Sequence, residues 1–188
     1  MGFLSKLFGR EDAAAVDARR IYTALMAQSR QPAFYGATRF EDDYDGRIDV
    51  LTLHIAAILS NLSRFGQNGE RLGQALFDEM KDDFEVALRE EALSDASVKK
   101  RIQPMISLFY DRVKKYAEAL NQEDSKESIG LAFMETLQVN EDDTENDRSR
   151  QGFVSKISAY LLAFDSNLSE LTLGEIALTQ FHFPDSPE

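Results

Sequence analysis

The sequence predicts an all-α fold, organised as a single compact domain of about six or seven helices. Apolar residues recur at three- and four-residue steps in several long segments, and no stretch shows the strict alternation of a half-buried strand. The chain has no cysteine, so its stability must come from a hydrophobic core, for which 43% hydrophobic residues are sufficient. We expect an amphipathic segment over residues 1–11, a helical domain over residues 12–183 and a tail over residues 184–188.

The amino-terminal segment carries its apolar side chains on one face of a short helix, with two cations beside that face. One interpretation is a weak membrane contact, in which the cations meet anionic headgroups. The other is a terminus that is disordered or docked on the core, because two to three turns bind lipid weakly without a second signal. The residues expected at a membrane are Phe3, Leu4, Lys6, Leu7, Phe8 and Arg10.

Asp12 is a suitable N-cap for a first helix that runs to about Ser29, and Gln31-Pro32 ends it. Residues 33–44 mix aromatic residues with turn formers, which predicts a structured loop, and Asp45-Gly46 indicates a turn. The second helix, over residues 47–65, is apolar on nearly all sides, so we expect it at the centre of the domain.

A turn at residues 66–69 should precede an amphipathic helix whose apolar positions recur every four residues, at Leu72, Leu76, Met80, Phe84 and Leu88. Ser94-Asp95 can cap a further helical turn. Pro104 fits the first turn of a helix better than its interior, which predicts a kink or break near Gln103.

The second half of the chain continues the helical pattern. A core stripe runs through residues 106–120, a turn follows at residues 121–125, and residues 129–139 indicate a short helix. Acidic residues concentrate at positions 140–147, which predicts an acidic loop. Residues 153–164 indicate the last long helix, followed by residues 168–178 and the aromatic pair Phe181 and Phe183.

Composition narrows the function and the location. The net charge of -12 disfavours direct nucleic-acid binding, because an acidic surface repels phosphates. No apolar run approaches the roughly 20 residues of a membrane span, and the first residues lack the pattern of a secretory signal. Early acids such as Glu11 and Asp17 argue against a mitochondrial presequence, so we interpret the chain as a bacterial cytoplasmic protein or as an already processed chain.

Motifs of enzymes and metal sites are missing from the sequence. Neither His54 nor His182 follows a glutamate by three residues, as a di-metal carboxylate site requires, and Arg148 occupies the position of the EF-hand glycine counted from Asp143. The acids at positions 78–85 could be paired catalytic carboxylates but are more typical of a solvated face. His54 is interpreted as a satisfied core histidine, with a functional hydrogen bond left open. We therefore expect neither enzymatic activity, nor a cofactor, nor a metal.

Several blocks, in order and spacing, resemble the ubiquinol-cytochrome c chaperone family. They are Phe34-Tyr35, residues 45–54, residues 74–78, residues 88–90, residues 93–101, the positions Phe109, Tyr110, Arg112, Tyr116, Ala119 and Leu120, residues 158–161, and Phe181-x-Phe183. The resemblance covers nearly the whole chain after Arg20. It implies a helical, non-enzymatic chaperone that holds newly made cytochrome b before cytochrome b enters the cytochrome bc1 complex.

The resemblance also implies partners and a location. We expect cytochrome b or another bc1 subunit as partner, a monomer or a complex with a small helper subunit, and a cytoplasmic protein peripheral at the inner face of the inner membrane. The chain's acidity would complement the basic cytoplasmic loops of a membrane protein. The alternative is a generic helical scaffold or regulatory adaptor that binds another basic protein.

Aromatic residues and arginines dominate binding hot spots. We therefore expect a partner-binding face where such residues occur in the blocks that resemble the chaperone family. The predicted residues are Phe34, Tyr35, Asp45, Arg47, Asp78, Arg89, Glu90, Lys100 and Arg101. The alternative is that Asp45, Arg47 and Arg89-Glu90 form structural ion pairs that tie loops to helices.

Overall fold

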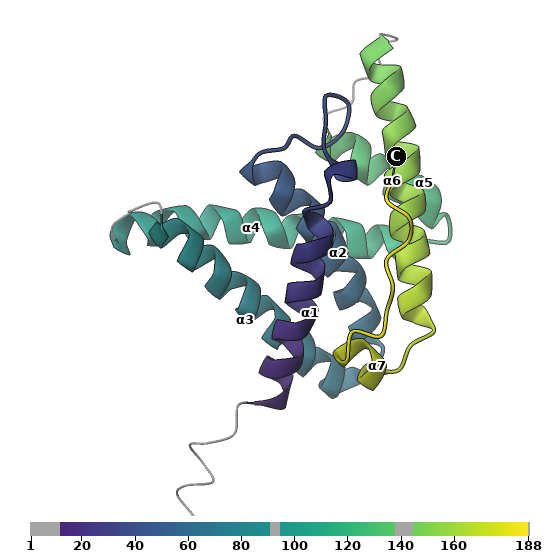
Figure 1. The fold of residues 1–188 in the computed structure, drawn as a ribbon. Coiled ribbons are helices and arrows are strands. Elements are labelled where there is room, and N and C mark those ends of the chain that lie inside the picture. Colours follow the sequence, from purple (N-terminus) through teal and green to yellow (C-terminus); the bar gives the residue numbers. More distant parts are fainter. Residues whose placement is uncertain (1–11, 91–94, 138–144, 188) are drawn as a thin grey trace, which may run out of the picture.

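The structure, a computed structural model, describes residues 12–90, 95–137 and 145–187. Within these residues the chain forms seven α-helices and one short 3-10 helix, and no β-strand (Figure 1). The all-α prediction is confirmed. The helices are α1 (Ala13–Ser29), α2 (Tyr44–Ser63), α3 (Gly66–Glu90), α4 (Asp95–Leu120), α5 (Ser125–Thr136), α6 (Glu145–Ser169) and α7 (Leu173–Ala177), with the 3-10 helix η1 at Pro32–Phe34.

Helix α2 is the central element. It is buried on nearly all sides from Ile48 to Ile58, and α1, α3, α4 and α6 all pack against it. This burial confirms the expectation drawn from its all-round apolar pattern. Helices α3 and α4 both contact α2. Away from α2, these two helices converge toward a common tip and form an arm at one side of the molecule (Figure 1).

Two helices begin earlier than predicted, because glycines lie inside their first turns. Asp43 caps α2 through a 2.8 Å hydrogen bond from the Gly46 amide, and a Cβ atom at position 46 would lie 2.0 Å from the Glu41 carbonyl oxygen. At the start of α3, a Cβ atom at Gly69 would lie 1.9 Å from the Leu62 carbonyl oxygen. The predicted turns at residues 45–46 and 66–69 are therefore helical turns that require close backbone approach.

The sequence predicts a kink or break near Gln103, and the break is wrong, since α4 is one helix from Asp95 to Leu120 with Pro104 inside it. Proline removes one backbone hydrogen bond and leaves the carbonyl four residues earlier without its donor. Here that carbonyl belongs to Lys100, and both Lys100 and Pro104 are exposed. Water can therefore satisfy the carbonyl, and helix packing along the arm maintains a continuous helix.

The last helices also differ from the predicted boundaries. Helix α5 begins at Ser125 rather than at residue 129, and α6 begins at Glu145 rather than at residue 153. Part of the predicted acidic loop is thus the first turn of α6, where the positive end of the helix dipole stabilises acidic residues. Residues 140–144 of that loop lie outside the described residues. After α7 the chain returns along α6, and the ring centroids of Phe181 and Phe183 lie 5.8 and 5.1 Å from that of Phe164 (Figure 1).

Candidate functional site

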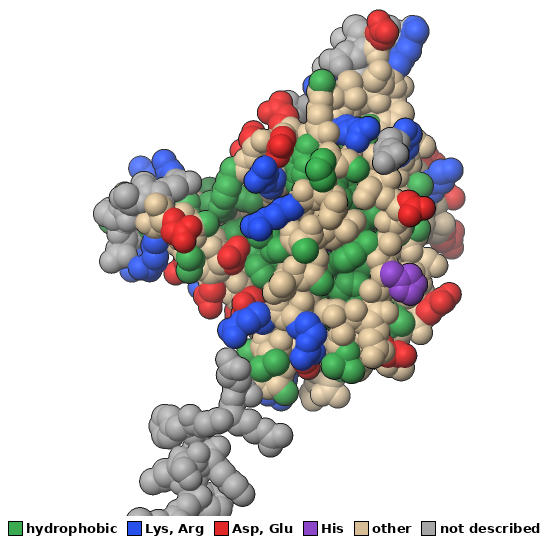
Figure 2. Space-filling view, in the orientation of Figure 1, with side chains coloured by type: hydrophobic (Ala, Val, Ile, Leu, Met, Phe, Trp, Pro, Cys, Tyr) green, Lys and Arg blue, Asp and Glu red, His purple; other side chains and the backbone are tan. Residues whose placement is uncertain are grey.

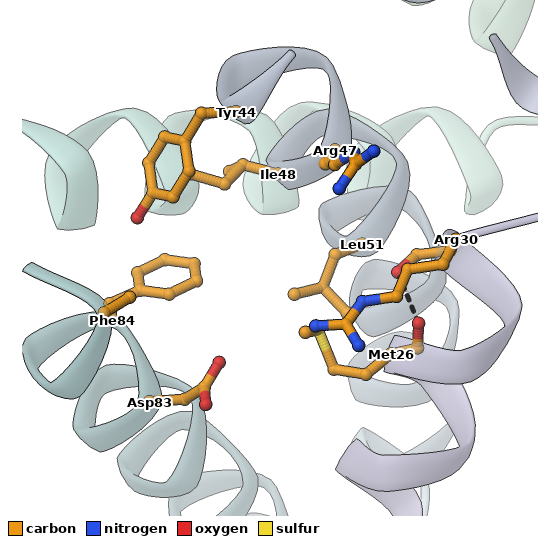
Figure 3. Close-up of a pocket in the computed structure, with 10 residues that line it drawn as sticks. Met26, Arg30, Tyr44, Arg47, Ile48, Leu51, Asp83 and Phe84 are labelled. Carbon is orange, nitrogen blue, oxygen red and sulfur yellow. Dashed lines mark hydrogen bonds between the residues drawn. The ribbon is translucent and has the colours of Figure 1, made fainter. Parts of the chain in front are cut away.

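A groove opens where α1, α2 and α3 meet, and we call it the Arg47 groove (Figure 3). Its volume is about 180 Å³. The floor is apolar and the rim is polar, so the groove offers a hydrophobic surface bordered by charge. The floor consists of Met26, Ile48, Leu51, Phe84 and Ala87, and the rim consists of Arg30, Tyr44, Arg47 and Asp83, while the buried Ser29 also lines the groove.

Helical spacing places these side chains together. The cap at Asp43 starts α2 at Tyr44, so Tyr44, Ile48 and Leu51 follow at four- and three-residue steps on one face. Phe84 belongs to the buried stripe of α3, and Asp83 stands beside it. Met26 and Arg30 are one turn apart at the end of α1. Figure 3 shows Tyr44 and Phe84 on one side of the groove and Arg30 reaching in from the other.

Two guanidinium groups and one carboxylate set the charge of the rim. The Tyr22 hydroxyl donates a 2.8 Å hydrogen bond to Asp83, and burial together with this carboxylate raises the pKa of Tyr22. Arg47 donates through Nε to Asp42 at 3.0 Å and also contacts Asp42 through a terminal nitrogen at 2.9 Å. Among the described residues, no carboxylate pairs with Arg30. The rim therefore retains cationic capacity for an incoming acidic or polar group.

The chemistry of the groove favours binding. An apolar floor with a few polar groups at the edge is the arrangement by which grooves accept amphipathic helices. The site is thus suited to an apolar side chain or helix face of a partner.

A second polar cluster lies in the core around His54. Gln28 donates to the Tyr160 hydroxyl at 3.0 Å, and Tyr160 and His54 Nε2 are 2.7 Å apart. His54 Nδ1 lies 2.7 Å from the Val50 carbonyl oxygen, which can only accept, so Nδ1 carries the proton and Nε2 accepts from Tyr160. Burial lowers the pKa of His54 to about 4, and the imidazole is neutral at neutral pH.

Aromatic rings enclose this histidine. The ring centroids of Phe34, Phe164 and Phe183 lie 5.6, 5.8 and 5.6 Å from that of His54, in edge-on arrangements. Both ring nitrogens are hydrogen-bonded and none of the described cavities is lined by His54. The interpretation of His54 as a satisfied core residue is confirmed, whereas the partners Gln28 and Tyr160 were missed because they come from distant helices.

The structure places two predicted binding residues in or near the core. Phe34 is fully buried and its ring lies 5.3 Å from that of Tyr160. Tyr35 is half-buried and donates its hydroxyl hydrogen to the Ser29 carbonyl. In this conformation the Phe34 ring cannot contact a partner, because the aromatic packing that holds η1 against α2 and α6 covers it.

The other predicted binding residues are exposed but do not form one face with Phe34 and Tyr35. Arg47 lines the groove, and Asp45 is exposed in the same first turn of α2. The remaining residues lie along the arm formed by α3 and α4. They are Asp78, Arg89, Glu90, Lys100 and Arg101. Arg47 pairs with Asp42 and so ties the preceding loop to α2, as the alternative of structural ion pairs anticipated, whereas the contact of Arg89 with Glu85 at 3.8 Å lies within α3.

Sequence reasoning missed most of the groove itself. Met26, Arg30, Tyr44, Asp83 and Phe84 were not among the expected binding residues. Identifying Asp43 as the cap of α2 would have placed Tyr44 and Arg47 on the same turn. No sequence signal shows that the end of α1 and the part of α3 around Phe84 lie near this turn of α2. That proximity depends on the angles at which the helices cross.

Two further calls concern membranes and metals. The residues expected to contact a membrane (Phe3, Leu4, Lys6, Leu7, Phe8 and Arg10) lie outside the described residues. No helix in the described ranges is both long and apolar enough to span a bilayer. The same ranges hold no cluster of three or more histidine or carboxylate side chains placed to bind a metal.

Comparisons with known proteins agree with the helical architecture. The model of the family described as ubiquinol-cytochrome C chaperone matches residues 37–183. The chain is also similar to a solved structure described as the crystal structure of the Cbp3 homolog from Brucella abortus, with 26% sequence identity and a TM-score of 0.74 over 98% of each chain. A search of curated proteins finds no match.

Proposed function

The chain belongs to the ubiquinol-cytochrome c chaperone family, and on this basis we propose that it holds newly made cytochrome b during assembly of the cytochrome bc1 complex. The protein acts by binding, without catalysing a reaction. Its role is to cover an apolar segment of the client until the segment finds its permanent partners, since exposed apolar surface of this kind drives aggregation.

The Arg47 groove is the observation that carries this proposal. A client segment can place one or two apolar side chains on the floor beside Phe84 and Leu51, while an acidic or polar side chain meets Arg30 or Arg47 at the rim. A newly made membrane protein exposes many segments of this kind. The groove thus fits one turn of an amphipathic or apolar helix.

The overall charge supports the same client. The net charge of -12 attracts the excess lysines and arginines on the cytoplasmic loops of membrane proteins. Acids on the exposed side of α3, such as Asp78 and Asp82, lie on the arm next to the groove. We propose that this charge guides the client to the protein, and that the chaperone works peripherally at the cytoplasmic side of the inner membrane.

Site-specific photo-crosslinking tests the proposal. A photoreactive residue at Tyr44, on the rim of the groove, should capture cytochrome b in cells that assemble the bc1 complex. The same residue at Leu131 is the control, since Leu131 is 61% exposed on α5 and does not line the groove. Capture from Leu131 but not from Tyr44 would show that the groove is not the client site.

A generic adaptor for another basic protein is the alternative function, and a genetic test separates the two. Deletion of the gene should abolish the mature bc1 complex while other respiratory complexes remain. Reintroducing the full chain should restore it. A bc1 complex that assembles normally in the deletion strain would favour the adaptor.

A further inference from the structure

A second apolar groove lies between α2, α3 and α4, and we call it the Phe77 groove. Its volume is about 270 Å³, and most of its lining is hydrophobic. The apolar lining residues are Leu59, Leu62, Phe77, Phe109, Tyr110 and Val113. Tyr110 is 50% exposed, and its ring centroid lies 4.8 Å from that of Phe77. The structure therefore leaves stacked aromatic surface uncovered on this side of the arm.

The amino-terminal segment joins the described structure close to this groove. Asp12 caps α1, and its carboxylate contacts Arg71 of α3 at 2.5 Å. Arg71 is next to residues that line the Phe77 groove. These are Glu70, directly before it, and Gly73 and Gln74, one turn after Glu70. On the surface of α3, Gln74 lies between Arg71 and Phe77, because these positions step around one side of the helix.

Residues 1–11 are long enough to enter the groove from this point. An extended chain of this length spans at most about 36 Å, and a helix of the same length spans about 16 Å. The stretch of α3 from Gly69 to Phe77 is about 12 Å long. The segment therefore reaches the whole groove in either conformation.

The chemistry of the segment complements the groove. Its apolar side chains fall on one helical face, at Phe3, Leu4, Leu7 and Phe8, with Lys6 and Arg10 beside them. The groove presents apolar surface with Glu70 on its border, and Asp78 is exposed one turn beyond Gln74. Apolar contacts in the groove and ion pairs at its edge are the contacts by which an amphipathic helix binds a groove.

We propose that residues 1–11 form an intramolecular ligand of the Phe77 groove. The apolar face that enters the groove is the same face that would enter a lipid interface. Docking and membrane contact therefore exclude one another, and the groove controls how much of the segment is available to a membrane. This inference concerns a different groove from the proposed client site and does not depend on the identity of the client.

Crosslinking within the chain tests the docked state, and the absence of natural cysteines makes the test unambiguous. In the full chain, Leu7→Cys is combined with Gln74→Cys at the groove or with Val16→Cys on α1 as the matched control, since Val16 is 36% exposed, lies one turn from Asp12 and does not line the groove. With a short bismaleimide reagent, the groove pair should react within one molecule about tenfold faster than the control pair, because docking raises the effective concentration. Equal rates for the two pairs would overturn the proposal.

A change in the groove provides the second measurement. Tyr110→Lys removes an aromatic ring and adds a charge that repels Lys6 and Arg10, so the rate for the groove pair should fall about fivefold. Val86→Lys adds the same charge at a 52% exposed position of α3 outside the groove and should leave the rate unchanged. An unchanged rate in Tyr110→Lys, or a rate that increases with protein concentration and so reports a second copy, would refute intramolecular docking.

Discussion

The core around His54 and the arm formed by α3 and α4 use similar aromatic residues in opposite ways. In the core, Phe34, Tyr160 and Phe164 surround a histidine whose two nitrogens are both hydrogen-bonded. Along the arm, the rings of Phe77 and Tyr110 pack on each other but remain partly open to solvent. On the face of the molecule that Figure 2 shows, hydrophobic side chains gather near the middle and charged side chains border them. The core arrangement stabilises the fold, whereas the arm leaves aromatic surface available for the recognition proposed above.

The largest expected effect is on the stability of the core. Phe34→Ala should lower the free energy of unfolding by about 3–5 kcal/mol, because it removes a fully buried ring that packs on His54 and Tyr160. Tyr110→Ala, at a half-exposed ring of the arm, should cost less than half as much. Urea denaturation measures both. Similar losses for the two variants would contradict the division between core and arm.

The pH dependence of stability should follow His54. Its pKa is about 4 in the folded protein and ordinarily about 6.5, so between these values the unfolded state binds more protons than the folded state. Stability is therefore lost as the pH falls from 6.5 toward 4. The loss from pH 7 to pH 5 should be about 2 kcal/mol.

The control for this prediction is His54→Gln, which removes the titrating group. Carboxylates also titrate in acid, so the informative quantity is the difference in slope between the unmodified chain and the variant. Urea denaturation at several pH values measures it. Parallel slopes would show that His54 is accessible to protons in the folded state.

Filling the Arg47 groove should weaken client binding more than it weakens the fold. Ala87→Trp places a large side chain on the floor of the groove and should reduce capture of cytochrome b from Tyr44 about tenfold. Val86→Trp is the matched control, one position away on the same helix and outside the groove. Equal capture by the two variants would separate the groove from client binding.

The smallest expected effect concerns membranes. Deleting residues 1–10 should lower co-sedimentation with phosphatidylglycerol vesicles about twofold, because a short amphipathic segment binds lipid weakly and the acidic domain is repelled by anionic lipid. If the segment docks in the Phe77 groove, Tyr110→Lys should raise co-sedimentation by releasing it. Unchanged binding after the deletion would remove the membrane contact from the function of this segment.

Periodicity predicted the helices well where a single helix face explains the pattern. The stripe from Leu72 to Leu88 is buried as expected, and α2 is central as its all-round apolar pattern indicated. Glycine and proline were less informative, since Gly46, Gly69 and Pro104 all lie inside helices. Their effect depends on the neighbouring backbone and on solvent access, neither of which is visible in the sequence.

The binding residues were harder to predict than the helices. Arg47 was identified and lines a groove, but Phe34 was expected at a binding face and lies in the core. An aromatic residue beside a turn has the same local signature in both cases. Its environment is decided by whether distant rings, here those of His54 and Tyr160, cover it.

By itself the sequence determined the all-α class, the central position of α2, the lack of cysteine chemistry and the acidic charge, because these depend on composition and on the period of one helix. Through its ordered blocks it also indicated the family. Only the tertiary structure decided which aromatic residues are buried, how His54 is hydrogen-bonded and where the two grooves open. These features arise from crossings between helices that are far apart in the chain, and the spacing of residues within one helix does not specify them.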